Sequence, residues 1–305
     1  LVLAIIHIGI ILAIVPRAPL TWTEIAAPAV IGGALWEAAR NLFGWLVGTD
    51  SFYLQLCGPL GGAVALLGWI YLSSVILVLT GSPQVEAVLT GEGGVLAGLR
   101  PGTVVMDCST ALPSSTVRMA QAVAQAGGRF LDTPMTRTPK EAAEGRLNLL
   151  VGGDAALLDE CRPILQCFAE NIFHAGPIGA GHSMKLLHNF VSLGTVALIA
   201  EAAACSAQHG VPPEAFVDIL AKGGGGGVAL ERLRPYLLRH DASGLRFFMS
   251  NALKDLGYYT TMAQDSAAAR GIAQAVRDTF AHAVTEGGPE KLVPELVDIL
   301  VKNPL

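Results

Sequence analysis

A lysine and an asparagine stand four residues apart in a strongly apolar stretch of this 305-residue sequence. Lys185 and Asn189 fall within residues 182–208, whose composition predicts a long buried helix. Residues four apart share one face of a helix, so the two polar groups should lie side by side. Burial disfavours the charged form of a lysine and lowers its pKa toward values that suit proton transfer. The pair could thus act as a general acid–base with an orienting amide, unless Lys185 is a surface lysine whose stem lies along apolar neighbours.

Two hydroxyl side chains, Ser109 and Thr110, follow the short apolar segment Val104–Asp107. That segment predicts a buried strand, and ligands bind at the carboxyl ends of the strands in open α/β sheets. Ser109 and Thr110 are therefore candidates for contact with a ligand. Ordinary turn residues ahead of a helix would have the same composition, and the sequence leaves both interpretations open.

Strands and helices alternate in the middle of the chain. Strands are predicted at 104–107, 129–132, 147–151 and 172–174, with helices at 114–126 and about 155–168. This alternation favours βαβ units and a largely parallel sheet within residues 81–178. After Gly181 the strand signals stop, which predicts an all-α domain over 179–305, with further helices at 213–221, 228–238, 250–283 and 290–301.

The first 80 residues have a different composition, which predicts transmembrane helices. No charge occurs between Asp50 and Glu86, and the uncharged run 59–80 is long enough to cross a hydrocarbon core of about 30 Å. Residues 1–15 and 25–47 predict two further spans, and a set of buried helices in a large core is the alternative. Val75–Leu79 could serve both as the end of the third span and as a buried parallel strand, since the two have similar compositions. The sequence opens on Leu1 rather than methionine, which favours a fragment.

Loop charge gives the predicted spans an orientation. Arg17 lies in the first loop, whereas the loop at 48–58 carries Asp50 and no basic residue. Positive loops stay in the cytoplasm, so the spans should lie in the inner (cytoplasmic) membrane with the C-terminal part in the cytoplasm. The net charge of −5 indicates no basic surface that would bind nucleic acid, so no nucleic-acid partner is expected. The five cysteines do not have the spacing of metal ligands, so no metal is expected.

Five motifs follow one another along the second part of the chain: Asp107–Pro113, Asp132–Thr138, Glu144–Asp154, Gly176–Asn189 and Lys254–Leu256. Their order and spacing resemble those of the β-hydroxyacid dehydrogenase family, which includes 3-hydroxyisobutyrate dehydrogenase and tartronate semialdehyde reductase. The resemblance runs from about Ser82 to the C-terminus. It implies a Rossmann-like α/β unit, a helical domain that dimerises, and hydride transfer between NAD or NADP and a small β-hydroxy acid or semialdehyde.

The resemblance implies roles for single residues. Lys185 matches the catalytic lysine of the family, and Asn189 would lie beside the reacting oxygen. Ser109 would contact both cofactor and substrate, while Thr110 and Lys254 would contact the cofactor. The competing interpretation of Lys254 is a solvated ion pair with the next residue, which contributes under about 1 kcal/mol.

The loop at 136–138 departs from the family pattern. Most members have Ser-Gly-Gly there, and that backbone binds the substrate carboxylate. Here Thr136, Arg137 and Thr138 occupy these positions as substrate-binding candidates, and Arg137 could hold a carboxylate through two hydrogen bonds. His188 replaces the first of two family asparagines, and a satisfied polar residue on a helix is its favoured interpretation.

The glycine motif that opens the family, G-x-G-x-M-G, has no counterpart in this sequence. The formal match Gly224–Ala229 follows a helix and is rejected. Residues 1–79 instead resemble the C-terminal end of the YihY/BrkB inner-membrane family, through Pro19–Thr23, Gly33–Trp45 and Gly61–Leu77. The sequence thus predicts a fusion with a partial cofactor domain and impaired activity. The alternative is a membrane protein, or a chimeric fragment, whose soluble domain is not catalytic.

Overall fold

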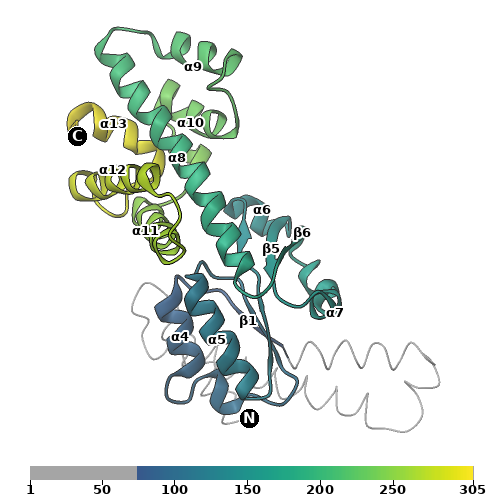
Figure 1. The fold of residues 1–305 in the computed structure, drawn as a ribbon. Helices are drawn as coiled ribbons and strands as arrows, with labels where there is room; N and C mark the ends of the chain where they lie inside the picture. Colours follow the sequence, from purple (N-terminus) through teal and green to yellow (C-terminus); the bar gives the residue numbers. More distant parts are fainter. Residues whose placement is uncertain (1–73, 305) are drawn as a thin grey trace, which may run out of the picture. The chain divides into compact units, whose positions relative to one another are not determined.

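The computed structural model describes residues 74–304, which belong to one compact unit, Ser73–Leu305 (Figure 1). The predicted spans at 1–15 and 25–47, and residues 59–73 of the third, lie outside the described residues. The likeness to the YihY/BrkB family falls almost wholly on that same stretch.

Six strands form a single sheet in the order β1-β2-β3-β5-β4, with β6 beside β5. The pairs β1–β2, β2–β3 and β5–β6 are parallel, whereas β5 runs antiparallel to both β3 and β4. The strands are β1 (Ser74–Leu77), β2 (Val104–Asp107), β3 (Arg129–Asp132), β4 (Met135–Thr136), β5 (Leu147–Gly152) and β6 (Ala169–Gly176).

Alternate side chains of these strands enter two different cores, as the pleat requires. Val105 and Phe130 pack against α4 (Ser82–Thr90) and α5 (Pro113–Gln125) on one face. Met106 and Leu131 pack against α7 (Ala155–Leu165) on the other. Both faces of the sheet are therefore covered, which explains why its strands appear in the sequence as continuous apolar runs.

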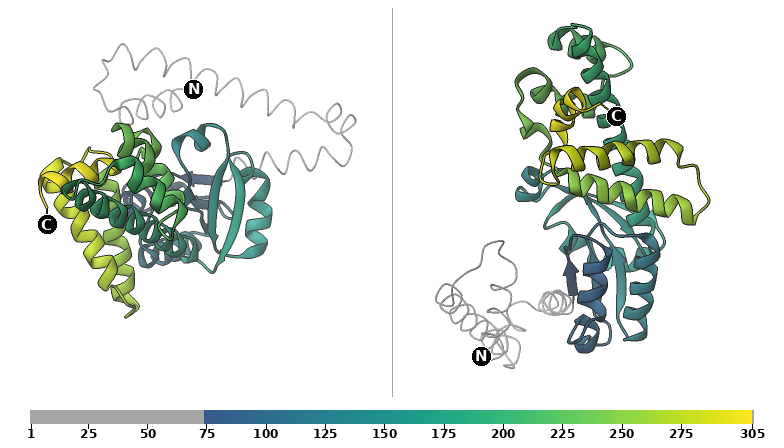
Figure 2. Two further views of the ribbon diagram at one scale, coloured as in Figure 1. Left: turned by 90° about the horizontal axis from the view of Figure 1, so that it is seen from above. Right: turned by 90° about the vertical axis from the view of Figure 1, so that its left-hand side faces the viewer.

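A helical domain begins with α8 (Ala180–Gln208), which packs against β5 at its start and against α10 to α13 further along (Figure 1). Helices α11 and α12 lie side by side in both views of Figure 2. Phe280, Met249, Leu230 and Leu233 are fully buried in this core. The remaining helices are α9 (Pro213–Lys222), α10 (Val228–Arg239), α11 (Met249–Asp265), α12 (Gly271–Gly287) and α13 (Leu296–Lys302). Short elements are η1 (Val95–Gly98), α6 (Pro139–Ala143), η2 (Ala242–Leu245) and η3 (Val293–Glu295).

The sheet is largely parallel, as the alternation of strands and helices predicts, and the antiparallel pairs among the described strands are β3–β5 and β4–β5. Two predictions of the sequence need correction. The residues Ser74–Leu77 form strand β1 beside β2, so the end of the predicted span 59–80 is a strand and the sheet begins before residue 81. The predicted helix 250–283 is two helices, separated near Ala267, whose φ is 53°.

Among the described residues, α8 alone is long and apolar enough to cross a membrane by length and composition. Its apolar residues Leu186, Leu193 and Ile199 are buried within the protein. Packing inside the domain therefore accounts for much of its apolar character.

Candidate functional site

Asn189 and Asp255 join α8 to α11 through a buried hydrogen bond. Asn189 Nδ2 donates to Asp255 Oδ2 over 2.7 Å, and both side chains are buried. His188 Nδ1 lies 3.0 Å from Asn189 Oδ1, so the carboxamide has a partner at each end. Lys254 Nζ lies 3.1 Å from Asp255 Oδ1. The orientation of the Asn189 amide is thus fixed by its neighbours rather than free.

Lys185 is half-buried one turn before Asn189, as the spacing predicts. Burial lowers the pKa of Lys185 below the ordinary value of a lysine. The negative charge of Asp255 opposes this lowering of the pKa, and the positive charge of Lys254 adds to it. An amine with a lowered pKa can exchange a proton near neutral pH more readily than a surface lysine.

Ser109 lies at the carboxyl end of β2, where the sheet meets the helical domain. Its side chain is buried, and Ser109 Oγ accepts a hydrogen bond of 2.9 Å from the backbone N–H of Leu79. The next residue, Thr110, is half-buried. The carbonyl oxygen of Ser109 lies 3.2 Å from His182 Nε2, on the first turn of α8. The predicted ligand-binding loop is therefore in direct contact with the helix that carries Lys185.

Lys254 connects α11 to the end of β1. Its Nζ donates to the carbonyl oxygen of Thr80 and lies 5.6 Å from the centroid of the Tyr258 ring. Tyr258 Oη in turn accepts the N–H of Ser82, the first residue of α4. Lys254 is thus more than a solvated ion pair, because it also ties the helical domain to the carboxyl edge of the sheet.

The candidates Thr136, Arg137 and Thr138 have partners at their own edge of the sheet. Thr136 is buried in β4, and Thr138 forms a capping box with Glu141 at the start of α6. Arg137 donates to the carboxylate of Glu170 and to a backbone carbonyl. In the described residues, no hydrogen bond links these three to Lys185. Arg137 has a φ of 88°, the left-handed conformation that glycine adopts most easily.

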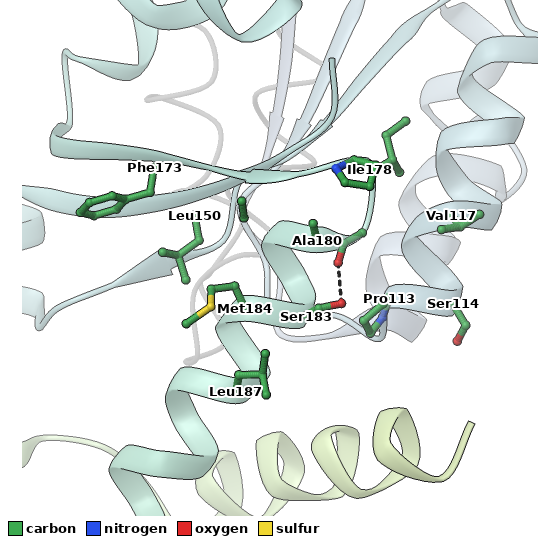
Figure 3. A pocket seen from close by; sticks show the side chains of 13 residues that line it. Pro113, Ser114, Val117, Leu150, Phe173, Ile178, Ala180, Ser183, Met184 and Leu187 are labelled. Carbon is green, nitrogen blue, oxygen red and sulfur yellow. Dashed lines mark hydrogen bonds between the residues drawn. The ribbon is translucent and has the colours of Figure 1, made fainter. Parts of the chain in front are cut away.

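An apolar cavity of about 890 Å³ lies on a different face of α8 (Figure 3). Neither Lys185 nor Asn189 lines it, and the hydroxyl of Ser183 already donates to the carbonyl oxygen of Gly179. This cavity holds none of the titratable groups described above and is separate from them. Its walls include Val117, Leu150, Phe173, Ile178, Met184 and Leu187.

Replacement of Asp255 by asparagine is expected to lower the pKa of Lys185 further, because a charge that stabilises the ammonium is removed. NMR titration of the Lys185 Cε resonance measures this pKa directly. Asp265→Asn, at the exposed end of α11, is the control and should leave the Lys185 titration unchanged. An unchanged or higher Lys185 pKa in Asp255→Asn would contradict the interaction.

Models of two protein families match the chain in succession. Residues 63–176 match the NAD binding domain of 6-phosphogluconate dehydrogenase, and residues 179–300 match the NAD-binding family of NADP-dependent 3-hydroxyisobutyrate dehydrogenase. The first match begins inside the predicted span 59–80. Residues 63–176 and 179–300 are therefore similar to domains of NAD- or NADP-binding dehydrogenases.

The 3-hydroxyisobutyrate dehydrogenase of Pseudomonas aeruginosa is 31% identical over 227 residues, covering 72% of this chain and 76% of that protein. The chain belongs to the 3-hydroxyisobutyrate dehydrogenase family. The 2-(hydroxymethyl)glutarate dehydrogenase of Eubacterium barkeri is 34% identical over 185 residues, 59% of this chain. The chain spans 61% of the length of that relative.

Solved structures of this family have the same fold. The 3-hydroxyisobutyrate dehydrogenase of Mycobacterium tuberculosis, with L-serine, superposes with a TM-score of 0.68 at 25% identity, over 75% of this chain and 79% of that one. A second, from Salmonella typhimurium, has a TM-score of 0.66 at 24% identity over 74% and 79% of the two chains. The α/β sheet followed by a helical domain is thus the fold of the family.

Sequence reasoning missed two residues beside this site. Asp132 and His182 are fully buried at the junction of the sheet and α8. Asp107 and Asp132 are register partners at the ends of β2 and β3. The sequence contains a signal for this pair, because each aspartate is the last residue of a predicted strand. The partnership with His182 depends on how α8 enters the sheet, and no local pattern shows it.

Proposed function

We propose that this chain transfers hydride between NAD or NADP and a small β-hydroxy acid or the corresponding semialdehyde. The observation that carries the proposal is the half-buried Lys185, with its lowered pKa, one turn from an Asn189 that Asp255 orients. Family membership supports the same reaction, because relatives include a 3-hydroxyisobutyrate dehydrogenase and an NAD-dependent L-serine dehydrogenase. Both names specify a small acid that carries a hydroxyl group.

Lys185 is the proposed general acid and base, which donates and accepts the proton of the reacting hydroxyl. In the reducing direction its ammonium gives a proton to the oxygen that becomes the hydroxyl, and in the oxidising direction its amine accepts that proton. Asn189 holds the same oxygen in place. The nicotinamide cofactor supplies or accepts the hydride. The protein therefore has to bind and orient the cofactor and the substrate, and to move one proton.

The described residues fit one part of such a cofactor. Parallel strands β1 and β2 end at the same edge, which is where dinucleotides bind in this class of sheet. Ser109 and Thr110 offer hydroxyl groups there, and Lys254 offers a positive charge that suits a phosphate-bearing ligand. Thr136, Arg137 and Thr138 remain the proposed contacts of the substrate carboxylate, which would have to compete with Glu170 for Arg137.

Cofactor affinity and membrane attachment are two further properties that we propose for this chain. Because the sequence has no G-x-G-x-M-G motif, we expect NAD(P) to bind more weakly than in a complete family member. The uncharged residues 51–73, which precede β1, support attachment of the chain to the inner membrane ahead of the sheet, with the C-terminal part in the cytoplasm. A fusion of a YihY/BrkB-like piece with a dehydrogenase piece would account for both features.

A homodimer through the all-α domain is also proposed. On α8 the apolar side chains Met184, Leu187, Val191 and Leu198 are exposed. Their spacing of three, four and seven residues is that of a seam between two packed helices. Contiguous exposed apolar surface of this kind favours an interaction site.

The decisive experiment separates cofactor binding from catalysis in the full chain, purified in detergent. Calorimetric titration with NAD and NADP measures binding, and oxidation of NADH or NADPH in the presence of methylmalonate semialdehyde or tartronate semialdehyde measures turnover. Turnover that Lys185→Ala removes would support the dehydrogenase. Absence of nucleotide binding would refute it and favour the non-catalytic domain.

A further inference from the structure

The first turn of α8 is capped by a carboxylate from the sheet. Asp132, at the end of β3, is fully buried, and its two oxygens accept the backbone N–H groups of Gly179 and His182 over 2.8 and 2.9 Å. First-turn N–H groups have no partner inside their own helix, and a negative charge is favourable at this end. The helix has no side-chain cap of its own, because its N-cap residue is Gly179. Asp132 therefore fixes where α8 begins relative to the sheet.

The ring of His182 connects that turn to two other elements. A carbonyl oxygen can only accept, so His182 Nε2 donates to the Ser109 carbonyl in the loop after β2. His182 Nδ1 lies 2.7 Å from Thr116 Oγ1 on α5. The carboxylates of Asp107 and Asp132 face the ring at 3.9 and 3.8 Å. The ring is fully buried, so α8, α5 and the loop cannot shift independently without losing these contacts.

Lys185 lies three residues after His182 on the same helix face. We propose that Asp132 and His182 are positioning residues, which hold the first turn of α8 against the Ser109 loop and thereby set the place and burial of the Lys185 amine. Neither residue touches the reacting atoms, so both act through Lys185. The catalytic consequence rests on the proposed function, whereas the consequence for the burial of Lys185 does not.

The test compares two substitutions of His182 in the full chain. His182→Gln keeps an N–H donor that can reach the Ser109 carbonyl, whereas His182→Leu keeps bulk and removes both hydrogen bonds. With a looser first turn, more water reaches Lys185, so its pKa should rise toward the ordinary value in the leucine variant. The glutamine variant should stay close to the wild type. NMR titration of the Lys185 Cε resonance measures the pKa of Lys185 in each variant and does not depend on enzymatic turnover.

Kinetics supply the second readout. His182→Leu should lower kcat about tenfold, with KM changed less than about threefold, because the amine is misplaced while substrate binding is retained. His182→Gln should restore most of kcat. The control is His282→Leu, which removes a 2.8 Å contact between a ring nitrogen on α12 and the Asn303 carbonyl after α13. That variant should leave both readouts unchanged.

A milder variant covers the case in which His182→Leu does not fold. Thr116→Val is nearly isosteric. It removes the partner of His182 Nδ1 and a hydrogen bond from Thr116 Oγ1 to the Leu112 carbonyl within α5, and it leaves the contact of His182 Nε2 in place. It should therefore shift the Lys185 titration in the same direction by a smaller amount. The charges that face Lys185, Asp255 and Lys254, are the same in every variant. An unchanged Lys185 titration in the folded His182→Leu and Thr116→Val variants would overturn the proposal. A shifted titration in a protein with no turnover would uphold the positioning role and refute the dehydrogenase.

Discussion

Replacing Lys185 by methionine is expected to reduce kcat by about 10²–10⁴-fold, the range contributed by a positioned general acid or base. Methionine keeps much of the length and apolar contact of the side chain and removes only the amine. The helix around Lys185 should therefore remain packed, and the loss should appear in kcat rather than in stability. Initial rates of NADH or NADPH oxidation with a semialdehyde substrate measure the effect.

Two further variants separate proton transfer from charge. Lys185→Arg keeps the positive charge, yet a guanidinium does not release its proton near neutral pH, so this variant should also be impaired. Lys222→Met removes an exposed lysine on α9 and should leave kcat unchanged. Full activity of Lys185→Met would remove the amine from the mechanism.

The lowered pKa of Lys185 should give the proposed reaction a direction-dependent pH profile. Reduction needs the protonated amine, so its rate should fall as the pH rises through the pKa of Lys185. Oxidation needs the neutral amine, so its rate should rise over the same interval. Because burial lowers this pKa, both limbs should lie below the pH at which an ordinary lysine titrates. Two profiles that run in parallel would mean that another group titrates.

The strands that are buried on both faces are predictable, because each is a continuous run of apolar residues in the sequence. The parts of the sheet that have no such apolar run are not predictable in this way. Val104–Asp107 and Arg129–Asp132 are strands in the structure with the bounds that the sequence predicts. Strand β4 has two residues, which is too short to produce any periodicity. For strand β1 the sequence leaves two roles open, because a buried strand and the end of a membrane span have similar apolar compositions.

The candidate site was predictable where it depends on one helix and not where it depends on packing. Lys185 and Asn189 share a face of α8 because four residues make about one turn. The contact between Asn189 and Asp255 joins residues 66 positions apart, and only the packing of α8 on α11 creates it. Likewise, the ion pair of Arg137 with Glu170 depends on β4 and β6 both pairing with β5, which no local pattern shows.

Gly181→Ala is expected to lower the free energy of unfolding by about 3 kcal/mol, the upper end of the usual cost of overpacking. A Cβ at this position would lie 2.3 Å from the carbonyl oxygen of Leu150 and 2.8 Å from both Asp132 Oδ2 and the N–H of Gly152. Two of these three neighbours are backbone atoms of the sheet, so they cannot rotate away. The first turn of α8 would have to move outward.

The outward movement in Gly181→Ala should stretch the hydrogen bonds from Gly179 and His182 to Asp132, so kcat should fall together with stability. Chemical denaturation and steady-state kinetics measure the two effects. The control is Gly257→Ala in α11, where an added Cβ meets nothing within 4 Å. Alanine is better than glycine inside a helix by about 1 kcal/mol, so the control should be slightly more stable than the wild type. A Gly181→Ala protein as stable as this control would show that α8 does not enter the sheet as closely as the distances indicate.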